Sequence, residues 1–444
     1  MIGQQSVFKK IFLIFILTMF MYTGRALAEE LISEQPVKLN SELSLDECID
    51  IAMQNNPSIQ SYFLNTDIFK SRIGQAKSYY FPQINVEASY DRYNSSISND
   101  ALDNNHNNFF TGVSLNQLLY DFGRTPTSIK INKINYDAST EDLRNRVREV
   151  VFDVKRYYHL VLLKMQTCDV YKESIELYEK QLEQAERLYN AGFKAKIDVI
   201  TAEVNLNNAR LDFITATNDL YATIEYLNNV MGLPGFNGYS LIGELKYADY
   251  TPDFDSLIDQ AYELRPDLKS VYLSKDSAEQ TQRYARKEYY PVISAKSAFG
   301  ARGDRSMDPS WSVGAVMSVP VFNGLLTHNK IKEAKATVLK READIKDLKQ
   351  FIYLEIKEFF LKLEETRQRI PLTELIVKQA EERLRLASGR YELGAGNIIE
   401  VKDAEIGLVN AKLNYLENLY EYNMAIFNIE KATGTDIPEL TATF

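Results

Sequence analysis

Apolar and polar residues alternate along four short segments, a period of two that is typical of β-strands with different side chains on their two faces. In the first segment, Ile84 and Val86 fall on one face and Asn85 and Glu87 on the other. The predicted strands lie at about residues 83–93, 108–119, 292–300 and 311–320. Their apolar faces comprise Ile84, Val86, Tyr90, Phe109, Val113, Leu115, Ile293, Phe299, Trp311, Val313 and Met317. Asn116 and Ser318 join Asn85 and Glu87 on the polar faces.

After each pair of strands the period changes, and apolar residues recur every three or four positions. This pattern predicts long helices with coiled-coil seams. Their expected ranges are about 125–190, 196–231, 326–390 and 397–432. At about 1.5 Å per residue, the first helix would be roughly 95 Å long, far more than an ordinary globular domain needs. Pro371 falls inside the third helix and is expected to kink it, because proline removes one backbone hydrogen bond.

The same order of elements occurs twice, at a nearly constant spacing, which indicates an internal duplication. Pro82 and Pro291 lie 209 residues apart, whereas Gly192 and Gly394 lie 202 residues apart. One length change of 7 residues in a single loop accounts for both spacings, and loops tolerate such changes. The expected domains are a signal peptide (1–28), a first repeat (29–235), an inter-repeat linker (236–253) and a second repeat (254–444).

The first residues are typical of a secretory signal, with Lys9 and Lys10 before an apolar run and a small-residue cleavage site ending at Ala28. The apolar run of roughly 12 residues is shorter than the about 20 that a membrane-spanning helix needs. A retained N-terminal anchor is the alternative interpretation. No longer apolar run follows Ala28, so the mature chain is expected to be soluble or to enter a membrane as β-strands.

Two hairpins of this kind are not stable alone, and lipid cannot satisfy the backbone groups at their edges. Four strands are also too few to close a membrane barrel, for which about eight is the smallest number known. The chain is therefore expected to oligomerise. The alternative is a soluble sheet that packs its apolar face against a core.

Enzyme chemistry finds little support in the sequence, so we expect no catalytic residue, cofactor or metal. The three histidines lie in no metal-binding or nucleophile motif. Cys48 and Cys168 have no counterparts in the other repeat and are expected to be buried thiols, with a disulfide as the alternative. Loss of the signal with its three basic residues moves the formal charge from −10 to −13, which argues against a nucleic-acid partner.

Four pairs of motifs resemble the outer membrane efflux protein family of TolC-like channels, and they cover nearly the whole mature chain. Each motif alone is loose, but four pairs in the same order in both repeats are specific. They are LDECIDIAMQNNP with FDSLIDQAYELRP, AKSYYFPQI with ARKEYYPVI, LLYDFGR with VPVFNG, and YNAGFKAKIDV with YELGAGNIIEV.

The resemblance implies a mainly α protein with β-strands, which forms a homotrimer. Three chains would close a 12-stranded transmembrane β-barrel, surrounded by outer-membrane lipid, above a periplasmic α-helical tunnel. Such a protein is a passive duct of an efflux pump or a type I secretion system. Its implied partners are a periplasmic adapter (membrane fusion) protein and an inner-membrane transporter of the RND or ABC type. The alternative is a soluble periplasmic coiled-coil scaffold or adapter without channel activity.

The same resemblance implies roles for residues near the two helix turns. Gly192 and Gly394 match the tips that meet the adapter. Glu400 and Asp403 match an acidic ring at the tunnel entrance. Tyr391 and Asp198 match a pair that holds the entrance shut, which we expect to be joined by a hydrogen bond from the tyrosine hydroxyl. The family has a basic residue in this gate where this chain has Gly396.

Overall fold

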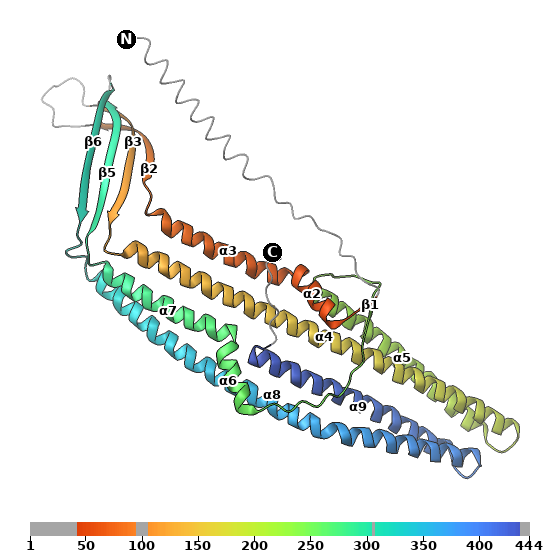
Figure 1. Ribbon diagram of the computed structural model, residues 1–444. Coiled ribbons are helices and arrows are strands. Elements are labelled where there is room, and N and C mark those ends of the chain that lie inside the picture. Colours follow the sequence, from red (N-terminus) through yellow and green to blue (C-terminus); the bar gives the residue numbers. More distant parts are fainter. Residues whose placement is uncertain (1–41, 95–104, 304–306, 436–444) are drawn as a thin grey trace. The chain divides into compact units, whose positions relative to one another are not determined.

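The computed structural model describes residues 42–94, 105–303 and 307–435, and the expected signal peptide lies outside them. Two similar series of elements follow each other along the chain (Figure 1). The first is β1 (Glu42–Leu43), α2 (Leu45–Asn55), α3 (Pro57–Ser78), β2 (Gln83–Asn94), β3 (Asn105–Tyr120), α4 (Arg124–Asn190) and α5 (Lys196–Met231). The second is β4 (Ser240–Leu241), α6 (Phe254–Leu264), α7 (Pro266–Lys287), β5 (Val292–Gly303), β6 (Asp308–Ser318), α8 (Leu326–Glu392) and α9 (Ile398–Thr433).

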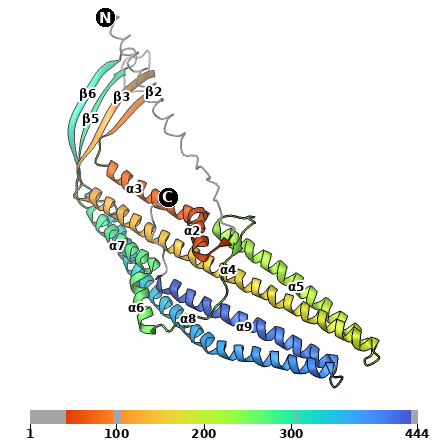
Figure 2. The same cartoon turned by 45° about the vertical axis from the view of Figure 1, so that its right-hand side comes forward.

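The long helices form two antiparallel hairpins, α4 with α5 and α8 with α9, and α4 also packs against α9 (Figure 2). The seam of α4 is apolar where it meets its neighbours, and Val147, Val154 and Val161 are buried. The shorter helices α3 and α7 lie along α4, on the side of the molecule that carries the strands. Among the described residues, no helix has both the length and the apolar composition needed to cross a bilayer.

The four long strands form one antiparallel sheet in the order β2-β3-β5-β6, so the two hairpins meet between β3 and β5, while the short strands β1 and β4 pair in parallel. Val113 on β3 lies opposite Val86 on β2 and Phe299 on β5, and Phe299 in turn lies opposite Trp311 on β6. Side chains alternate along each strand, so this register places every residue of the predicted apolar faces on one face of the sheet. The expected alternation is thus confirmed.

The strands extend further into the polar segments than the sequence predicts. The predicted strands end at about residues 93 and 300 and resume at about 108 and 311, but the ladder continues to the pair Asn94 and Asn105 in the first hairpin and to Arg302 and Asp308 in the second. A hairpin ladder joins backbone groups, so polar side chains do not end it where they can stay in water. The last strand, by contrast, ends at Ser318, before Pro320, which cannot donate to a ladder.

The turn from strand to helix has the same unusual backbone in both repeats. Two consecutive residues have positive φ: Phe122 (54°) and Gly123 (83°) in the first repeat, and Gly324 (65°) and Leu325 (66°) in the second. Such values favour glycine, yet each repeat keeps one side chain there. Phe122 stacks on Tyr290, with ring centroids 5.5 Å apart.

Arg124, which follows this turn, donates hydrogen bonds to the backbone carbonyls of Lys287, Glu288 and Tyr290 at 2.7–2.9 Å. These carbonyls lie at the end of α7, in the second repeat. The first strand-to-helix turn is therefore held by residues of the other repeat.

In each repeat a second contact joins the start of the short helix (α3 or α7) to the end of a long helix (α5 or α9). The two repeats use different side chains for it. The Asn56 amide donates to the carbonyl of Val230 at 2.7 Å, and at the matching place Arg265 donates to the carbonyl of Ala432 at 3.0 Å. Arg265 is 4% exposed and is neutralised by Glu355 and Asp267. The buried arginine is thus fully paired, as a buried charge must be.

Two further expectations concern Pro371 and the cysteines. Helix α8 continues through Pro371, whose side chain is exposed, and the kink expected there stays a prediction. Cys48 and Cys168 are both free thiols, but only Cys48 is buried, and burial raises its pKa to about 12. Cys168 is half-buried.

Candidate gate at the two helix turns

The two long hairpins reverse direction at Gly192 and Gly394 with the same hydrogen-bond pattern. Gly192 donates to the carbonyl of Tyr189, and the next residue donates to that of Leu188; Gly394 and its successor repeat the pattern. This is a helix C-terminus with a left-handed residue, and φ is +78° at Gly192 and +74° at Gly394. Apart from the adjoining residues of the chain, no described atom lies within 4 Å of where a side chain would begin at either glycine. The backbone conformation, rather than lack of space, therefore requires glycine here.

Just above the turns, an apolar cluster joins all four long helices. It combines residues of α4 and α5 with residues of α8 and α9, and its largest member is the fully buried Tyr391. The buried members are Ala185, Ala202, Leu384, Tyr391, Ile398, Val401, Ala404 and Leu408. The two hairpin tips of one chain are thus packed together near their ends.

The hydrogen bond expected between Tyr391 and Asp198 is not formed, so that expectation is wrong. The hydroxyl of Tyr391 has no hydrogen-bond partner among the described residues, although the whole side chain is buried. Burial raises the pKa of Tyr391, and the nearby Asp198 carboxylate raises it further. The physical reason is the placement of the ring: it lies inside the apolar cluster and carries the hydroxyl in with it, so the carboxylate acts only through its field.

Lys194, in the α4–α5 turn, joins the two hairpins instead. Its ammonium lies 4.9 Å from the centre of the Tyr391 ring and donates a hydrogen bond of 3.0 Å to the backbone carbonyl of Gly396. The hydrophobic pattern and the family motifs do not single out this residue. Lys194 and Gly396 are 202 residues apart, so they occupy equivalent positions of the two repeats.

A side chain at position 396 would be crowded. A Cβ atom there would lie 3.1 Å from the backbone nitrogen of Tyr391 and 3.2 Å from Arg390. Because these neighbours belong to the same tight turn, this backbone cannot hold a basic side chain at position 396 without shifting. The carbonyl of Gly396 nevertheless takes part in the contact, as the acceptor for Lys194.

Glu400 and Asp403 are exposed on the first turns of α9, as two residues on one helix face. The Asn397 side chain caps this helix by accepting from the Glu400 backbone at 2.9 Å. Arg390 approaches the Glu400 carboxylate at 3.9 Å. Their exposure leaves both carboxylates available to ions, and their role as an entrance ring remains a prediction.

A buried carboxylate lies one turn further along α9. Glu405 is 4% exposed, one of its oxygens has no partner among the described residues, and burial raises its pKa to about 8. Gln181 on α4 and Asn205 on α5 are equally buried and also carry unpartnered polar atoms. From the sequence alone, Glu405 would be placed on a solvated face of α9. The sequence of α9 does not show that α4 packs against this helix.

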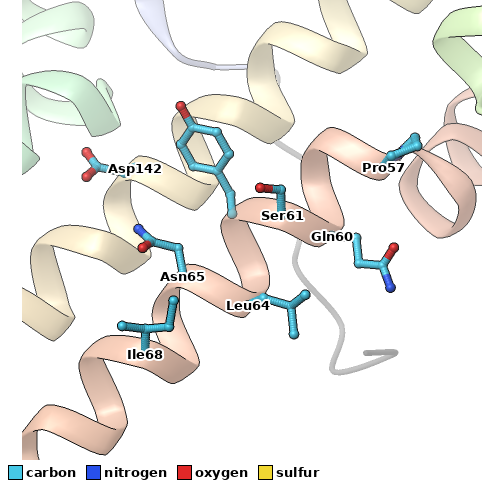
Figure 3. Close-up of a pocket in the computed structure, with 8 residues that line it drawn as sticks. Pro57, Gln60, Ser61, Leu64, Asn65, Ile68 and Asp142 are labelled. Carbon is cyan, nitrogen blue, oxygen red and sulfur yellow. The ribbon is translucent and has the colours of Figure 1, made fainter.

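Other candidate chemistry is sparse in the described part of the chain. No group of three or more histidine, cysteine or carboxylate side chains there could hold a metal ion. A hollow of about 740 Å³ lies along α3 and is open to solvent (Figure 3). Its lining is mostly apolar or amide, with Tyr62, Leu64 and Ile68 exposed. Asp142, its acidic residue, accepts a hydrogen bond from Ser270.

The outer membrane efflux protein family model matches residues 48–233 and 257–435, once in each repeat. The chain belongs to the outer membrane efflux protein family. Among curated relatives, outer membrane protein TolC of Escherichia coli is 22% identical over 86% of this chain and 80% of its own length. CyaE of Bordetella pertussis is 20% identical over 86% of this chain and 82% of its own.

Solved structures share the fold of this outer membrane efflux protein. The CmeC outer membrane channel of Campylobacter jejuni superposes with a TM-score of 0.78 at 16% identity, over 89% of this chain and 87% of that one. The open state of the MtrE outer membrane channel of Neisseria gonorrhoeae superposes with a TM-score of 0.74 at 17% identity, over 88% of both chains. The predicted fold class is thereby confirmed.

The four-stranded sheet is the second candidate site of this outer membrane efflux protein. Its apolar face is open: Val86, Phe299, Trp311, Val313 and Met317 are each more than 60% exposed. Exposed apolar area of this extent marks a surface that contacts lipid or another protein.

Proposed function

We propose that this chain is one protomer of a trimeric outer-membrane export channel. The observation that carries the proposal is the sheet, which in the described part of the chain has one apolar exposed face and two unpaired edges, β2 and β6. In lipid, unpaired backbone groups cost several kcal/mol each, so such edges must be closed. Three copies, joined β6 to β2, make a 12-stranded barrel with the apolar face toward lipid and Glu87, Asn85, Asn116 and Ser318 toward the lumen.

Aromatic residues support the placement of the sheet in a membrane. Where the strands meet the helices, Tyr79, Phe81, Tyr120, Tyr289 and Phe322 are exposed. Tyrosine and other aromatic residues gather at the boundary between lipid and water, where their rings are apolar and their edges polar. This cluster fits the periplasmic boundary of the barrel.

The helices also lack partners that further copies would supply. Two long helices carry exposed apolar stripes of coiled-coil kind. The stripe on α5 comprises Ile200, Val204, Leu211, Ile214 and Tyr221, and that on α8 comprises Leu354, Leu361, Leu372, Ile376 and Leu386. Packing α5 of one protomer against α8 of the next would cover both stripes. It would continue the barrel as a helical tunnel, and the hollow on α3 would lie beside the same interface.

In this assembly the helix turns form the periplasmic entrance, with Glu400 and Asp403 as its acidic ring. The glycine turns at Gly192 and Gly394 are the docking surface for a periplasmic adapter. The adapter would connect the duct to an inner-membrane transporter of the RND or ABC type. The names of the relatives support this: SrpC is a solvent efflux pump outer membrane protein, and AprF an alkaline protease secretion protein. The chain is then a passive duct and not an enzyme.

Fractionation and electrophysiology test this proposal together. We expect the chain in the outer membrane, released only by detergent as a trimer, and expect purified trimer to produce ion-conducting steps in planar bilayers. A periplasmic monomer that is soluble without detergent and inactive in bilayers would instead support the alternative, a coiled-coil scaffold.

A further inference from the structure

Among the described residues of the two hairpin turns, the ammonium of Lys194 is the one side-chain group of the first turn that donates a hydrogen bond to the backbone of the second. It is half-buried, and no carboxylate among the described residues forms an ion pair with it. Its acceptors are a neutral carbonyl and the face of an aromatic ring.

The ring of Tyr391 is well suited to bind this cation. A cation near the face of a tyrosine ring is attracted by the quadrupole of the ring, and the attraction grows when the pair is shielded from water. Tyr391 is fully buried in the cluster that joins the four helices, so its ring cannot turn away. Its hydroxyl makes no hydrogen bond within the described chain that would compete for the side chain.

The backbone of Gly396 supplies the second contact. Its carbonyl accepts the hydrogen bond from Lys194 at 3.0 Å, and a Cβ atom at position 396 would lie 3.1 Å from the Tyr391 nitrogen, so a side chain there would shift this turn by a few tenths of an ångström. The first repeat thus provides the cation and the equivalent position of the second repeat provides the acceptor. Any movement that separates the two tips must break both contacts at once.

We infer that Lys194 is the latch of the closed entrance, and that Tyr391 contributes to closure through the face of its ring rather than through its hydroxyl. The inference rests on the proposed channel function. Opening the entrance separates the α4–α5 turn from the α8–α9 turn and releases the ammonium to water.

Single-channel recording in planar bilayers tests the latch. Lys194→Met keeps the length of the stem but removes the charge, and should raise the open-to-closed ratio on the order of tenfold per protomer, a factor that corresponds to about 1.4 kcal/mol. Lys196→Met is the matched control, because Lys196 is exposed two residues further on and makes neither contact. We expect it to conduct like the wild type.

Two tyrosine variants separate the ring from the hydroxyl. Tyr391→Leu removes the ring contact but leaves the hydrogen bond from Lys194 to Gly396, so it should open the channel without adding to the effect of Lys194→Met in the double variant. Tyr391→Phe keeps the ring and should open the channel less than Tyr391→Leu. Equal effects of the two substitutions, or additive effects in the double variant, would overturn the latch.

The outcomes also separate the latch from the proposed function. A wild-type trimer that never conducts contradicts the channel itself. A conducting wild type with an unchanged Lys194→Met variant contradicts only the latch. If Lys194→Met does not assemble, Lys194→Gln is used in its place. The comparison of Tyr391→Leu with Tyr391→Phe is a separate test of the latch, because the latch requires that Tyr391→Leu open the channel more.

Discussion

The buried carboxylate of Glu405 makes the packing of the hairpins sensitive to pH. Its pKa is raised from 4.5 to about 8 by burial, so the folded protein holds this proton more tightly than the unfolded chain does. The stability that comes from the neutral form is fully present below about pH 4.5, and it is lost as the pH rises toward about 8. Glu405→Gln keeps the shape of the side chain and removes its ionisation.

The size of the effect follows from the two pKa values. Each pH unit between them corresponds to about 1.4 kcal/mol at 25 °C. The free energy of unfolding of the E405Q variant should therefore match that of the wild type near pH 4.5. It should exceed the wild-type value by about 3 kcal/mol per protomer at pH 7, and by about 5 kcal/mol above pH 8.

Urea unfolding of the detergent-solubilised protein, followed by helical circular dichroism at pH 5 and pH 8.5, measures this difference. Glu381→Gln is the control: this carboxylate is exposed on α8. Its replacement should leave the free energy of unfolding unchanged, within about 0.5 kcal/mol, at both pH values. An E405Q variant whose advantage is the same at pH 5 and pH 8.5 would show that Glu405 is not buried as a neutral acid.

Three further predictions concern the sheet, the turns and the entrance. Val113→Arg should destabilise the protein by about 2–4 kcal/mol if the residue faces the middle of the bilayer, whereas Ser114→Arg should be tolerated; equal labelling of cysteines at the two positions by aqueous reagents would contradict this. Gly394→Val should abolish export and adapter binding in a pull-down, because a side chain is strained at this positive φ. The trimer should persist on gels, because the new side chain would point into open space, and loss of the trimer would indicate a purely structural glycine. Glu400→Ala with Asp403→Ala should lower cation selectivity, measured as the reversal potential in a salt gradient, and remove block by trivalent cations. Unchanged block would mean that these carboxylates lie outside the entrance.

The fold was accessible from sequence because its signals are local and are repeated. The period of two around Val86 predicted which side chains share a sheet face. Gly192 and Gly394 predicted where the hairpins turn, because a left-handed residue needs glycine. The strand ends were less accessible, since backbone pairing continues through polar residues such as Arg302 wherever their side chains reach water.

The contacts at the two helix turns could not be predicted in the same way, because they depend on how four helices approach one another. Whether the Tyr391 hydroxyl meets Asp198 depends on the placement of the ring in the apolar cluster. Lys194 looked like any turn lysine until its distance to Gly396 was known. Glu405 could be identified as buried only once α4 was seen to cover α9.

The bonds from Arg124 to the carbonyls at the end of α7 have a consequence for the order of folding. Arg124 and Tyr290 are 166 residues apart, so the first strand-to-helix turn stays incomplete until the start of the second repeat has crossed the inner membrane. The positive φ of Phe122 adds to this, because the stacking partner that holds it in place, Tyr290, arrives equally late. Contacts this distant in sequence form slowly. The N-terminal half is therefore expected to wait in an unfinished, chaperone-accessible state, and a chain cut after the first repeat should be degraded rather than assembled.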